Sequence, residues 1–472
     1  MSSDAPRIAA PDRFDAIVVG SGEAGKSIAW HLGSLGKRVA VVERDALGGA
    51  CPNVACLPSK NLVHSAKIAS YLGRREFGLP ESSAGVDMAR VHARKVEMVA
   101  DLQAIHVGKF QKAHDEILRG TARFVAPKTF RVTLRNEPPR TIFGEQIFLA
   151  TGSRATVAAV PGLRESSPMT HVELLDVADV PRHLLVLGGG YVGLEFAQAM
   201  RRFGSDVTVV ERNPRILPAE DLDVSTAMSE LFASEGIALI VGARLAKVEG
   251  RSGERVRLCG TVDGKELSLE GSHLLVATGR TPNTDDLDAA RGGVALTDRG
   301  HVRVNERLET TAPDVWAMGD CAGSPYFTHI SFEDFRIVRD NLGGANRVTT
   351  GRQVPSCLFT DPELARVGLD ETRAKESGVP YRLAKMPMAA VLRTRTLSET
   401  RGFLKALVGD DERILGFTGF GVGAGELLPV IQLAMTQSLP YTAIRDLTMT
   451  HPTLSEGLVT LFSTVSARAR ET

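Results

Sequence analysis

Two stretches of this chain share one pattern of glycines. Each runs from an apolar segment through G-x-G-x-x-G and a helix-length segment to a second apolar segment that ends in Glu. In both stretches the Glu stands 23 residues after the first glycine, and both close on the letters VVER. A glycine turn between a strand and a helix, with an acid about 20 residues further on, is typical of a dinucleotide-binding βαβ unit. The chain is therefore predicted to use one βαβ unit twice.

The glycine spacing that the two copies share has a physical reason. The first glycine permits a tight turn, the second lets the backbone approach a pyrophosphate, and the third lets the helix pack close to the strand. The pyrophosphate then faces the helix N-terminus, and the carboxylate after the second strand can bind a ribose diol. The residues are Gly20, Gly22, Gly25 and Glu43 in the first copy and Gly188, Gly190, Gly193 and Glu211 in the second.

The first copy also spells G-x-x-x-x-G-K-[ST], the loop that cradles the phosphates of ATP or GTP. An NTPase needs an acid at the end of an apolar strand to hold magnesium, and VWAMGD, ending at Asp320, is the best candidate. The second copy has Leu194-Glu195 where such a loop needs Lys-Ser. A dinucleotide turn is therefore favoured over an NTPase, and Lys26 is expected at the surface or near the pyrophosphate.

Charge and composition exclude several classes of protein. Lys and Arg number 56 and Asp and Glu number 56, so a zero formal charge disfavours a general nucleic-acid binder. No apolar run reaches the roughly 18 residues of a membrane span, and the first residues lack the pattern of a signal peptide. Five cysteines in 472 residues are not a disulfide scaffold. A cytoplasmic protein with neither a membrane nor a nucleic-acid partner is expected.

Cys51 and Cys56 follow directly on the first βαβ unit, in GGACPNVACLPSK. Two buried small residues would be the simplest explanation, and a metal site would need further ligands at suitable spacing. A redox pair fits better, because Pro52 suits the first turn of a helix and a helix N-terminus favours thiolate. Lys60 adds a nearby cation. A thiolate is the attacking species in disulfide exchange.

Gly48 to Lys60 resembles the redox signature of the pyridine nucleotide–disulfide oxidoreductases, which include glutathione reductase, lipoamide dehydrogenase and mercuric reductase. This chain has Ala55 where that signature usually has Gly, and Ala50 where it often has Thr. The resemblance runs over almost the whole chain. Its other motifs are ATGSR (150–154), VPGL (160–163), ATGRTPN (277–283), VWAMGD (315–320), FTDPELARVGLDE (359–371), GFLKALV (402–408) and ILGFTGFGVGAGELL (414–428).

The resemblance implies an α/β fold with two Rossmann-like domains, the second inserted in the first, and a C-terminal α+β dimerisation domain. The FAD-binding domain is expected at 1–155 and 280–347, the NAD(P)H-binding domain at 156–279 and the interface domain at 348–472.

The resemblance also implies a reaction. Electrons pass from NAD(P)H to FAD, then to a Cys51–Cys56 disulfide and on to a substrate. Cys56 is expected against the flavin, and Cys51 is expected to be the thiol that meets the substrate. His451 and Glu456, in HPTLSE, resemble a catalytic dyad that serves Cys51 of the other subunit, so a homodimer is expected.

Further residues are implied to bind the two cofactors, and no metal site is expected. Tyr191 matches a residue that often gates the nicotinamide pocket, and Lys60 and Glu195 match a charge pair beside the flavin. For FAD the further residues are Gly49, Lys60, Ala122, Thr151, Gly152, Gly319, Asp320 and His329. For NAD(P)H they are Tyr191, Glu195, Gly279 and Arg280.

The identity of the reductant and the substrate rests on fewer residues. Glu211 favours NADH, because a carboxylate repels the 2′-phosphate of NADPH, although Arg212 could attract that phosphate. A disulfide substrate is expected, with Hg(II), Cu(II) or another oxidant as the alternative and lipoamide less favoured. GSGEAGK and FTHISFEDFRIV look most like mercuric-reductase-like and reactive-chlorine-resistance flavoproteins, but the sequence ends without the C-terminal cysteine pair of mercuric reductase. A flavin-binding redox sensor without turnover is the non-enzymatic alternative.

Overall fold

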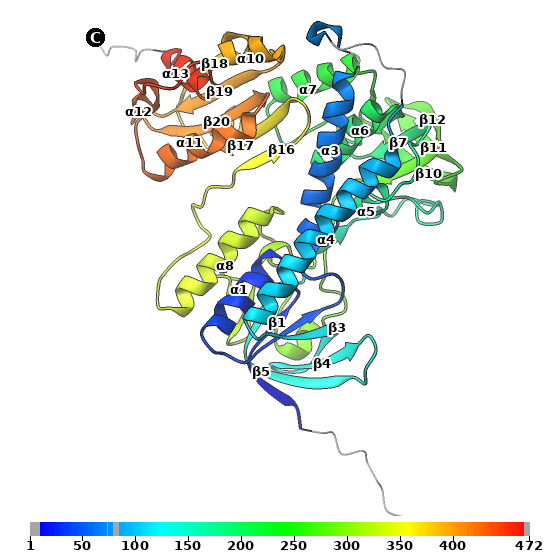
Figure 1. Ribbon diagram of the computed structural model, residues 1–472, viewed down its shortest axis with the longest axis vertical. Helices are drawn as coiled ribbons and strands as arrows, with labels where there is room; N and C mark the ends of the chain where they lie inside the picture. Colours follow the sequence, from blue (N-terminus) through cyan, green and yellow to red (C-terminus); the bar gives the residue numbers. More distant parts are fainter. Residues whose placement is uncertain (1–9, 73, 79–84, 467–472) are drawn as a thin grey trace, which may run out of the picture. The chain divides into compact units, whose positions relative to one another are not determined.

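The computed structural model describes residues 10–72, 74–78 and 85–466. Figure 1 shows the order of the helices and strands along the chain. The chain divides into two compact units. The first contains residues up to 61 together with 92–156 and 279–352, and the second contains 62–91, 157–278 and the residues from 353 onward.

The first unit is built on a sheet in which β1 lies between β2 and β5, and all three strands run parallel. Residues 16–19 of β1 are all buried, as expected for a parallel strand covered on both faces. Strand β3 pairs with β2 in the parallel direction, and β4 pairs with β3 in the antiparallel direction. The strands are β1 (Asp12–Val19), β2 (Val39–Glu43), β3 (Glu116–Ala126), β4 (Thr129–Leu134), β5 (Arg140–Leu149), β6 (Ser153–Ala155), β14 (Arg280–Pro282) and β15 (Val315–Ala317).

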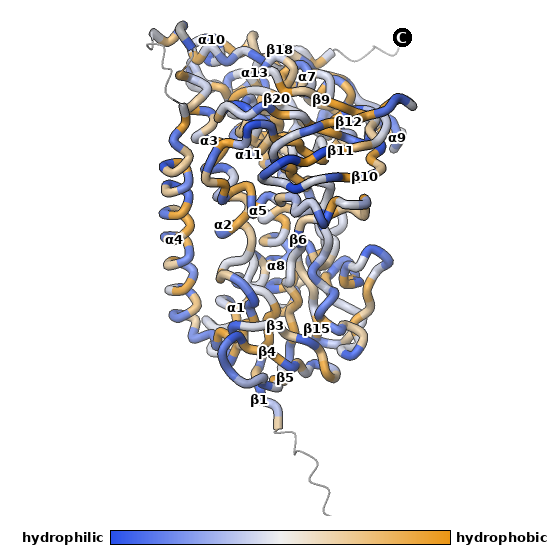
Figure 2. The backbone as a smooth tube through the Cα atoms, turned by 90° about the vertical axis from the view of Figure 1, so that its right-hand side faces the viewer, coloured by the Kyte–Doolittle hydropathy of each residue, from blue (hydrophilic) through white to orange (hydrophobic). Residues whose placement is uncertain are grey.

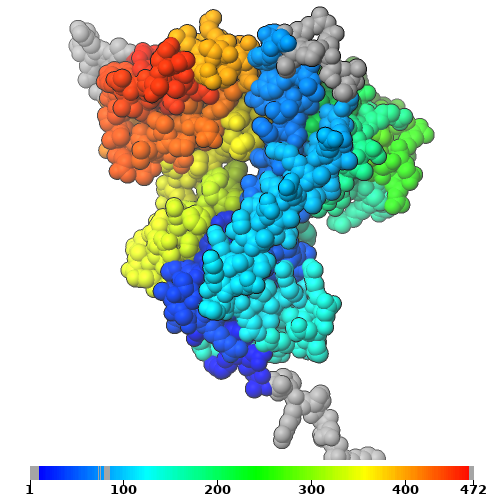
Figure 3. Space-filling model, in the orientation of Figure 1, coloured from blue at the N-terminus to red at the C-terminus, as the bar shows by residue number. Residues whose placement is uncertain are grey.

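Two helices of the first unit pack on its sheet. Ile28 of α1 and Val338 of α8 pack with Val18 in one hydrophobic cluster on one side of the sheet. The helices are α1 (Glu23–Ser34), α2 (Ala50–Asn53) and α8 (Thr328–Leu342). Two longer helices, α3 (Cys56–Tyr71) and α4 (Met88–Lys112), extend from one unit into the other. Helix α4 alternates between hydrophobic and hydrophilic residues along its length (Figure 2), and one side of it lies at the surface (Figure 3).

The second unit repeats the parallel arrangement with the strand order β13-β7-β8-β9. An antiparallel sheet of β10, β11 and β12 follows it. The strands are β7 (His183–Leu187), β8 (Asp206–Val210), β9 (Ala238–Ile240), β10 (Arg244–Arg251), β11 (Arg255–Val262), β12 (Lys265–Gly271) and β13 (His273–Val276). The helices are α5 (His171–Leu174), α6 (Tyr191–Phe203) and α7 (Leu222–Ser234).

The C-terminal part of the second unit is an antiparallel sheet with the order β16-β17-β20-β19-β18. Its helices include α11, which packs on β17 and β20 (orange in Figure 1). The strands are β16 (Ser356–Leu358), β17 (Glu363–Gly368), β18 (Arg382–Pro387), β19 (Phe403–Val408) and β20 (Ile414–Gly421). The helices are α9 (Glu371–Glu376), α10 (Leu392–Leu397), α11 (Ala424–Thr436), α12 (Thr442–Arg445) and α13 (Glu456–Ser463).

This part is joined to the α6–α7 region by a buried charge cluster. The ammonium group of Lys405 lies 2.7 Å from Asp221, 3.0 Å from Asp223 and 3.0 Å from Glu371. Three carboxylates around one buried cation compensate its lost hydration. The pKa of Lys405 is raised because these acids outweigh the opposing effect of burial.

The predicted α/β class, with two dinucleotide-type units and an α+β C-terminal part, is confirmed. The predicted boundaries of the three domains stay predictions. The structure does assign residues 62–91 to the second unit. The reason is packing, since Leu62, Ala66 and Met88 belong to one hydrophobic cluster with residues of β7 and α6. Within the described ranges, no helix combines the length and apolarity needed to cross a membrane.

Asp115 generates a prediction about stability. Both of its carboxylate oxygens are buried without a hydrogen-bond partner among the described residues, and burial raises its pKa to about 7. A carboxyl with a raised folded-state pKa contributes its full stability below its unfolded pKa and loses it as pH rises through about 7. We expect Asp115→Asn to raise the free energy of unfolding at pH 8 by about 1 kcal/mol, since partial exposure screens the charge.

Urea denaturation at pH 8 and at pH 5.5 checks this expectation. The advantage of Asp115→Asn should shrink at the lower pH, where the wild-type carboxyl is neutral. An equal advantage at both pH values would show that the buried charge is not the cause.

Candidate active site

The first glycine of each copy permits a turn that no other residue allows. Gly20 has φ +95° and Gly188 has φ +109°, in the left-handed region. A β-carbon at Gly20 would lie 2.3 Å from the carbonyl oxygen of Ala150, and one at Gly188 would lie 2.4 Å from that of Ala277. Both turns are therefore closed against the strand next to them.

The third glycine of each copy lets the helix approach the first glycine. A β-carbon at Gly25 would lie 2.0 Å from the carbonyl oxygen of Gly20, and one at Gly193 would lie 2.1 Å from that of Gly188. Any side chain at either position would push the helix away from the strand. The predicted reason for the third glycine is thus visible in both copies.

The second glycine of each copy leaves open space, as a pyrophosphate requires. Gly22 is the N-cap of α1 and Gly190 is the N-cap of α6, and no side chain caps either helix. A β-carbon at either position would meet no atom within 4 Å. The free N–H groups and the positive end of each helix fit a phosphate-bearing cofactor. The two glycine turns therefore suit two dinucleotides.

Glu43 ends β2 as a buried carboxylate with a defined set of donors. Its Oε2 accepts from the backbone N–H of Ser21 at 2.9 Å and from the Ser21 hydroxyl at 2.7 Å. Its Oε1 accepts from the backbone N–H of Asp45 at 2.8 Å. Since a carboxylate oxygen accepts two hydrogen bonds, Oε1 keeps one position for a ribose hydroxyl.

Glu211 directly follows β8 and has the same arrangement of backbone donors. Its Oε2 accepts from the backbone N–H of Gly189 at 2.7 Å, and its Oε1 accepts from the backbone N–H and the side chain of Asn213 at 2.8 and 2.6 Å. Here Oε2 keeps the free position. The side chain of Arg212 is exposed beside it. The internal repeat predicted from glycine spacing therefore extends to individual hydrogen bonds.

Each predicted redox cysteine lies at the start of a helix, although the two helices are different. Cys51 lies in α2, and Cys56 is the first residue of α3. Neither sulfur is in a disulfide. The Sγ of Cys56 lies 3.3 Å from the hydroxyl oxygen of Thr328, the first residue of α8. The positive end of α3 and this hydroxyl both stabilise a thiolate at Cys56.

The two thiols have different proton affinities. The pKa of Cys51 is raised well above its usual range, first because its S–H donates to Cys56 and second because it is buried. Cys51 therefore resists deprotonation, while the end of α3 and the Thr328 hydroxyl favour negative charge on Cys56. The predicted role of Cys51 as the exchange thiol stays a prediction, and it would need a base.

The turn that carries Cys51 rests on the first glycine turn. Gly49 has φ +73°, and a β-carbon there would lie 2.5 Å from the Cα of Gly22. The Asn53 amide donates to the carbonyl of Gly49 at 2.7 Å and accepts from Gln103 of α4 at 2.9 Å. This contact brings the cysteines beside the space where the pyrophosphate fits.

Asp320 lies in a short 3-10 helix (Gly319–Ala322) that follows β15, in a polar group of three residues. The hydroxyl of Ser153 donates to its carboxylate, and Arg280 donates to Ser153 at 2.7 Å. Burial raises the pKa of Asp320, and the bond from Ser153 and the charge of Arg280 oppose that rise. Gly279 and Arg280 were predicted to bind NAD(P)H, yet they lie in the first unit with Asp320. Their role toward NAD(P)H stays a prediction.

The other residues predicted to bind FAD also lie in the first unit. The hydroxyl of Thr151 is buried with no hydrogen-bond partner of ordinary geometry among the described residues, which suits a polar cofactor group. Gly152 has φ +68°, Ala122 is buried on β3, and Lys60 lies in α3. His329 lies in the first turn of α8, and Gly319 precedes Asp320 with φ +72°.

Tyr191 and Glu195 lie on α6 and contact the C-terminal part. The Tyr191 hydroxyl donates to Glu220 at 3.1 Å and lies 3.3 Å from the Ser356 hydroxyl. Burial and the Glu220 carboxylate raise the pKa of Tyr191. Glu195 is buried and accepts from the backbone N–H of Phe359 at 2.9 Å. The gating role of Tyr191 and the pair of Glu195 with Lys60 stay predictions.

His451 and Glu456 form the predicted dyad. The Nδ1 of His451 lies 3.0 Å from one carboxylate oxygen of Glu456 and 3.1 Å from the other. The His451 side chain is 60% exposed. A carboxylate that holds Nδ1–H leaves Nε2 as the proton acceptor. The dyad thus has the geometry of an oriented base.

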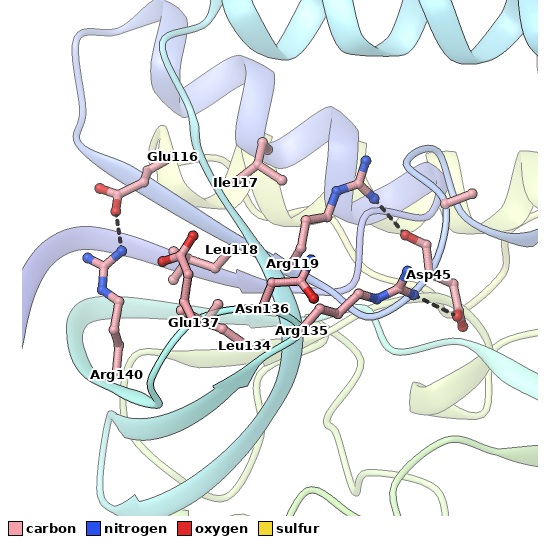
Figure 4. A pocket seen from close by; sticks show the side chains of 11 residues that line it. Asp45, Glu116, Ile117, Leu118, Arg119, Leu134, Arg135, Asn136, Glu137 and Arg140 are labelled. Atoms are coloured by element: carbon pink, nitrogen blue, oxygen red, sulfur yellow. Dashed lines mark hydrogen bonds and ion pairs between the residues drawn. The ribbon is translucent and has the colours of Figure 1, made fainter.

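A pocket of about 680 Å³ lies beside β3 and the end of β2 (Figure 4). Its charged residues pair with one another, as Arg140 does with Glu116 at 2.8 Å and Arg135 with Asp45 at 3.4 Å. None of the predicted catalytic or cofactor-binding residues lines it. In the described part of the chain, no group of three or more His, Cys, Asp or Glu side chains is arranged to hold a metal ion.

Sequence reasoning did not find Thr328, Asn53 or Gln103. Thr328 is 272 residues from Cys56, and nothing in its own sequence context marks it as a thiol partner. Asn53 lies inside the redox motif, so its position was a possible signal for a residue that holds the turn. Gln103 lies in α4, a helix whose many charged residues predict only a face exposed to solvent.

Comparisons with known proteins agree with this geometry. Residues 14–334 match the family model "Pyridine nucleotide-disulphide oxidoreductase", and residues 354–462 match the dimerisation domain of the same family. The chain is 35% identical to the probable pyridine nucleotide-disulfide oxidoreductase RclA of Escherichia coli, over 96% of this chain and 100% of that protein. It is 32% identical to a mercuric reductase of Staphylococcus aureus, over 94% of this chain and 81% of that protein.

Solved structures give the same result. The structure of the HOCl-induced flavoprotein disulfide reductase RclA from Escherichia coli superposes with a TM-score of 0.87, over 96% of this chain and 100% of that one, at 35% identity. Its Cu(II) complex superposes over the same shares with a TM-score of 0.88, at 35% identity. The chain therefore belongs to the pyridine nucleotide–disulfide oxidoreductase family and is a flavoprotein disulfide oxidoreductase that uses a pyridine nucleotide.

Proposed function

We propose that this enzyme uses NADH to reduce a disulfide substrate through FAD and the Cys51–Cys56 pair. The observation that carries the proposal is the position of Cys51 in α2 and of Cys56 at the start of α3, with their turn resting on the glycine turn of the first unit. When bound, the flavin supplies the pair with the two electrons of the nicotinamide. The disulfide bond between Cys51 and Cys56 then breaks and leaves two sulfurs that share one proton.

The residues of the chain carry the exchange steps. The thiolate of Cys51 attacks one sulfur of the substrate, which forms a mixed disulfide and releases the first thiol. The thiolate of Cys56 attacks Cys51, which restores the internal disulfide and releases the second thiol. Each cycle therefore consumes one NADH and one proton and converts one disulfide into two thiols.

His451 is the proposed base for Cys51. Because Cys51 keeps its proton beside Cys56, it must give that proton up before it attacks. Glu456 holds Nδ1 of His451, so Nε2 takes the proton and returns it to the leaving thiol. The exposure of His451 and the match of 354–462 to a dimerisation domain favour a homodimer in which the dyad serves the partner's thiol.

NADH is proposed over NADPH because of Glu211. Its carboxylate is fixed by Gly189 and Asn213 and has one free acceptor position for a ribose hydroxyl. A 2′-phosphate at this place would meet a negative charge. Five cysteines in 472 residues do not form a disulfide scaffold, so we propose that the enzyme acts in the cytoplasm.

A second candidate function is reduction of a metal ion or of another oxidant. Similarity to a reductase that is HOCl-induced and forms a Cu(II) complex favours Cu(II) among metal ions. Two adjacent sulfurs are good ligands for a soft metal ion, so the Cys51–Cys56 dithiol is the place where Cu(II) or Hg(II) would be reduced.

The redox pair is tested by adding NADH to the yellow protein without oxygen. We expect a long-wavelength absorbance band from the Cys56 thiolate beside the flavin, and Cys56→Ser should abolish it. Cys259→Ser, on β11, is the matched control and should keep the band. Reoxidation by disulfides, Cu(II), Hg(II) and quinones then ranks the substrates. If none of them acts faster than oxygen, the proposed substrate classes are wrong.

The dimeric site is tested with hybrid dimers. Cys51→Ser and His451→Ala homodimers should each lose about 10²-fold or more in disulfide reduction. A hybrid of one chain of each kind combines one intact Cys51 with one intact His451 from its partner. Such a hybrid, isolated through two different affinity tags, should recover about half of the wild-type rate. A hybrid as inactive as its parents would show that the dyad does not act across the dimer.

The preference for NADH is tested by comparing kcat/KM for the two nucleotides. Glu211→Ala should lower kcat/KM for NADH by about tenfold or more, since a hydrogen bond to a charged group contributes roughly 1.5–3 kcal/mol. Arg212→Ala is the matched control and should leave NADH unchanged. A wild-type enzyme that prefers NADPH, with the preference lost in Arg212→Ala, would overturn this part of the proposal.

A further inference from the structure

Lys26, the residue expected at the surface or near the pyrophosphate, is buried. Its ammonium nitrogen lies 2.8 Å from a carboxylate oxygen of Glu23, one turn earlier in α1. It also lies 3.0 Å from Nε2 of His106 in α4. The ammonium group of Lys26 therefore contacts an acid on its own helix and an imidazole ring on a different helix.

The tautomer of His106 follows from its two contacts. Its Nδ1 lies 2.6 Å from the carbonyl oxygen of Leu102, which can only accept, so Nδ1 carries the proton. Nε2 is then the acceptor for the ammonium of Lys26. The ring stacks on Trp30 with centroids 6.0 Å apart, and burial lowers the pKa of His106. A neutral, fixed imidazole thus links Lys26 to α4.

His106 in turn lies against the backbone of the redox turn. A β-carbon at Gly48 would be 3.3 Å from two carbons of the His106 ring. The side-chain amide of Gln103, three residues earlier in α4, donates to the side-chain oxygen of Asn53 at 2.9 Å. Helix α4 therefore contacts the turn on both sides of Cys51, once through each of these residues.

Glu23 places a negative charge near the same thiol. Its carboxylate is one of the groups that raise the pKa of Cys51, together with Cys56 and burial, and the Thr328 hydroxyl acts in the opposite direction. Among the described residues, the charged and titratable groups with the largest effects on Cys51 and His106 are Glu23, Lys26, Cys56 and Lys109, from three helices. Lys26 is the cation in direct contact with Glu23.

The second copy of the βαβ unit shows that helix packing does not require a lysine. The position that corresponds to Lys26 is Leu194, which is fully buried, and the position of Glu23 is Tyr191. A buried cation costs free energy unless it is paired, so an apolar residue would be the simpler choice for packing alone. The ion pair occurs in the copy that is followed by the cysteine pair.

We propose that Lys26 is a positioning residue for the exchange thiol: its ammonium, placed by His106 of α4, neutralises Glu23, which directly follows the Gly22 on which the turn of Cys51 rests. This inference rests on the proposed function only in taking Cys51 as the thiol that meets the substrate. It predicts that the reactivity of Cys51 depends on the balance of charge between Lys26 and Glu23.

The test measures the reactivity of Cys51 in holoprotein without any turnover. All variants carry Cys56→Ser, so that Cys51 is the remaining thiol of the pair, and iodoacetamide labelling of Cys51 is followed from pH 6 to 10 by peptide mass spectrometry. Lys26→Met should slow labelling at pH 7 by about threefold to tenfold, because an uncompensated acid favours the neutral thiol. Glu23→Gln should speed labelling.

The double variant Glu23→Gln, Lys26→Met separates charge from packing. If charge balance is the cause, labelling of Cys51 returns close to that of the parent, and Lys26→Arg also keeps the parental rate. If the double variant is as slow as Lys26→Met, or if neither single variant changes labelling, the inference is wrong. Flavin content and thermal unfolding identify variants that misfold, and Glu23→Gln, which keeps the lysine, still tests the sign of the effect.

Failure of this inference and failure of the proposed function are distinguishable. Labelling of Cys51 uses neither NADH nor a substrate, whereas the anaerobic reduction uses both cofactors and Cys56. A normal absorbance band with no effect of Lys26→Met on labelling would leave the proposed reductase intact and remove only the role of Lys26.

Discussion

The close contact between the redox turn and the first glycine turn is the constraint on which the rest of the site depends. At this contact Gly49 meets Gly22 so closely that a β-carbon on Gly49 would lie 2.5 Å from the neighbouring Cα. The glycine turn that suits a pyrophosphate and the two sulfurs proposed to carry electrons are thereby held in one small region. Helix α3 starts at Cys56, so its positive end acts on the same place.

The two copies of the βαβ unit hold their acids with the same backbone arrangement. The acids Glu43 and Glu211 are each fixed by a backbone N–H one residue after the first glycine and by another two residues after the acid. The copies differ where the helix begins. The first copy carries the buried pair of Glu23 and Lys26, whereas the second carries Tyr191, whose hydroxyl bonds to Glu220.

Much of the fold could be predicted because the information is local. Glycine spacing, the apolar strands and the acid after each second strand are set by contacts within about 25 residues, and such patterns are readable in a single sequence. The dyad of His451 and Glu456 is equally local. Thr328 beside Cys56 and His106 beside Lys26 were not predicted, because residues far apart in the chain meet only when helices pack.

Lys26 has a sequence context that was predictable and contacts that were not. The amino-acid sequence alone determined that a dinucleotide turn surrounds this lysine, that a second copy exists and that a cysteine pair follows. Only the tertiary structure decided that the lysine is buried between Glu23 and His106 and that Leu62, Ala66 and Met88 pack in the second unit. The physical reason is that a side chain's charge partner and burial depend on which distant elements cover it, and a local pattern does not specify that.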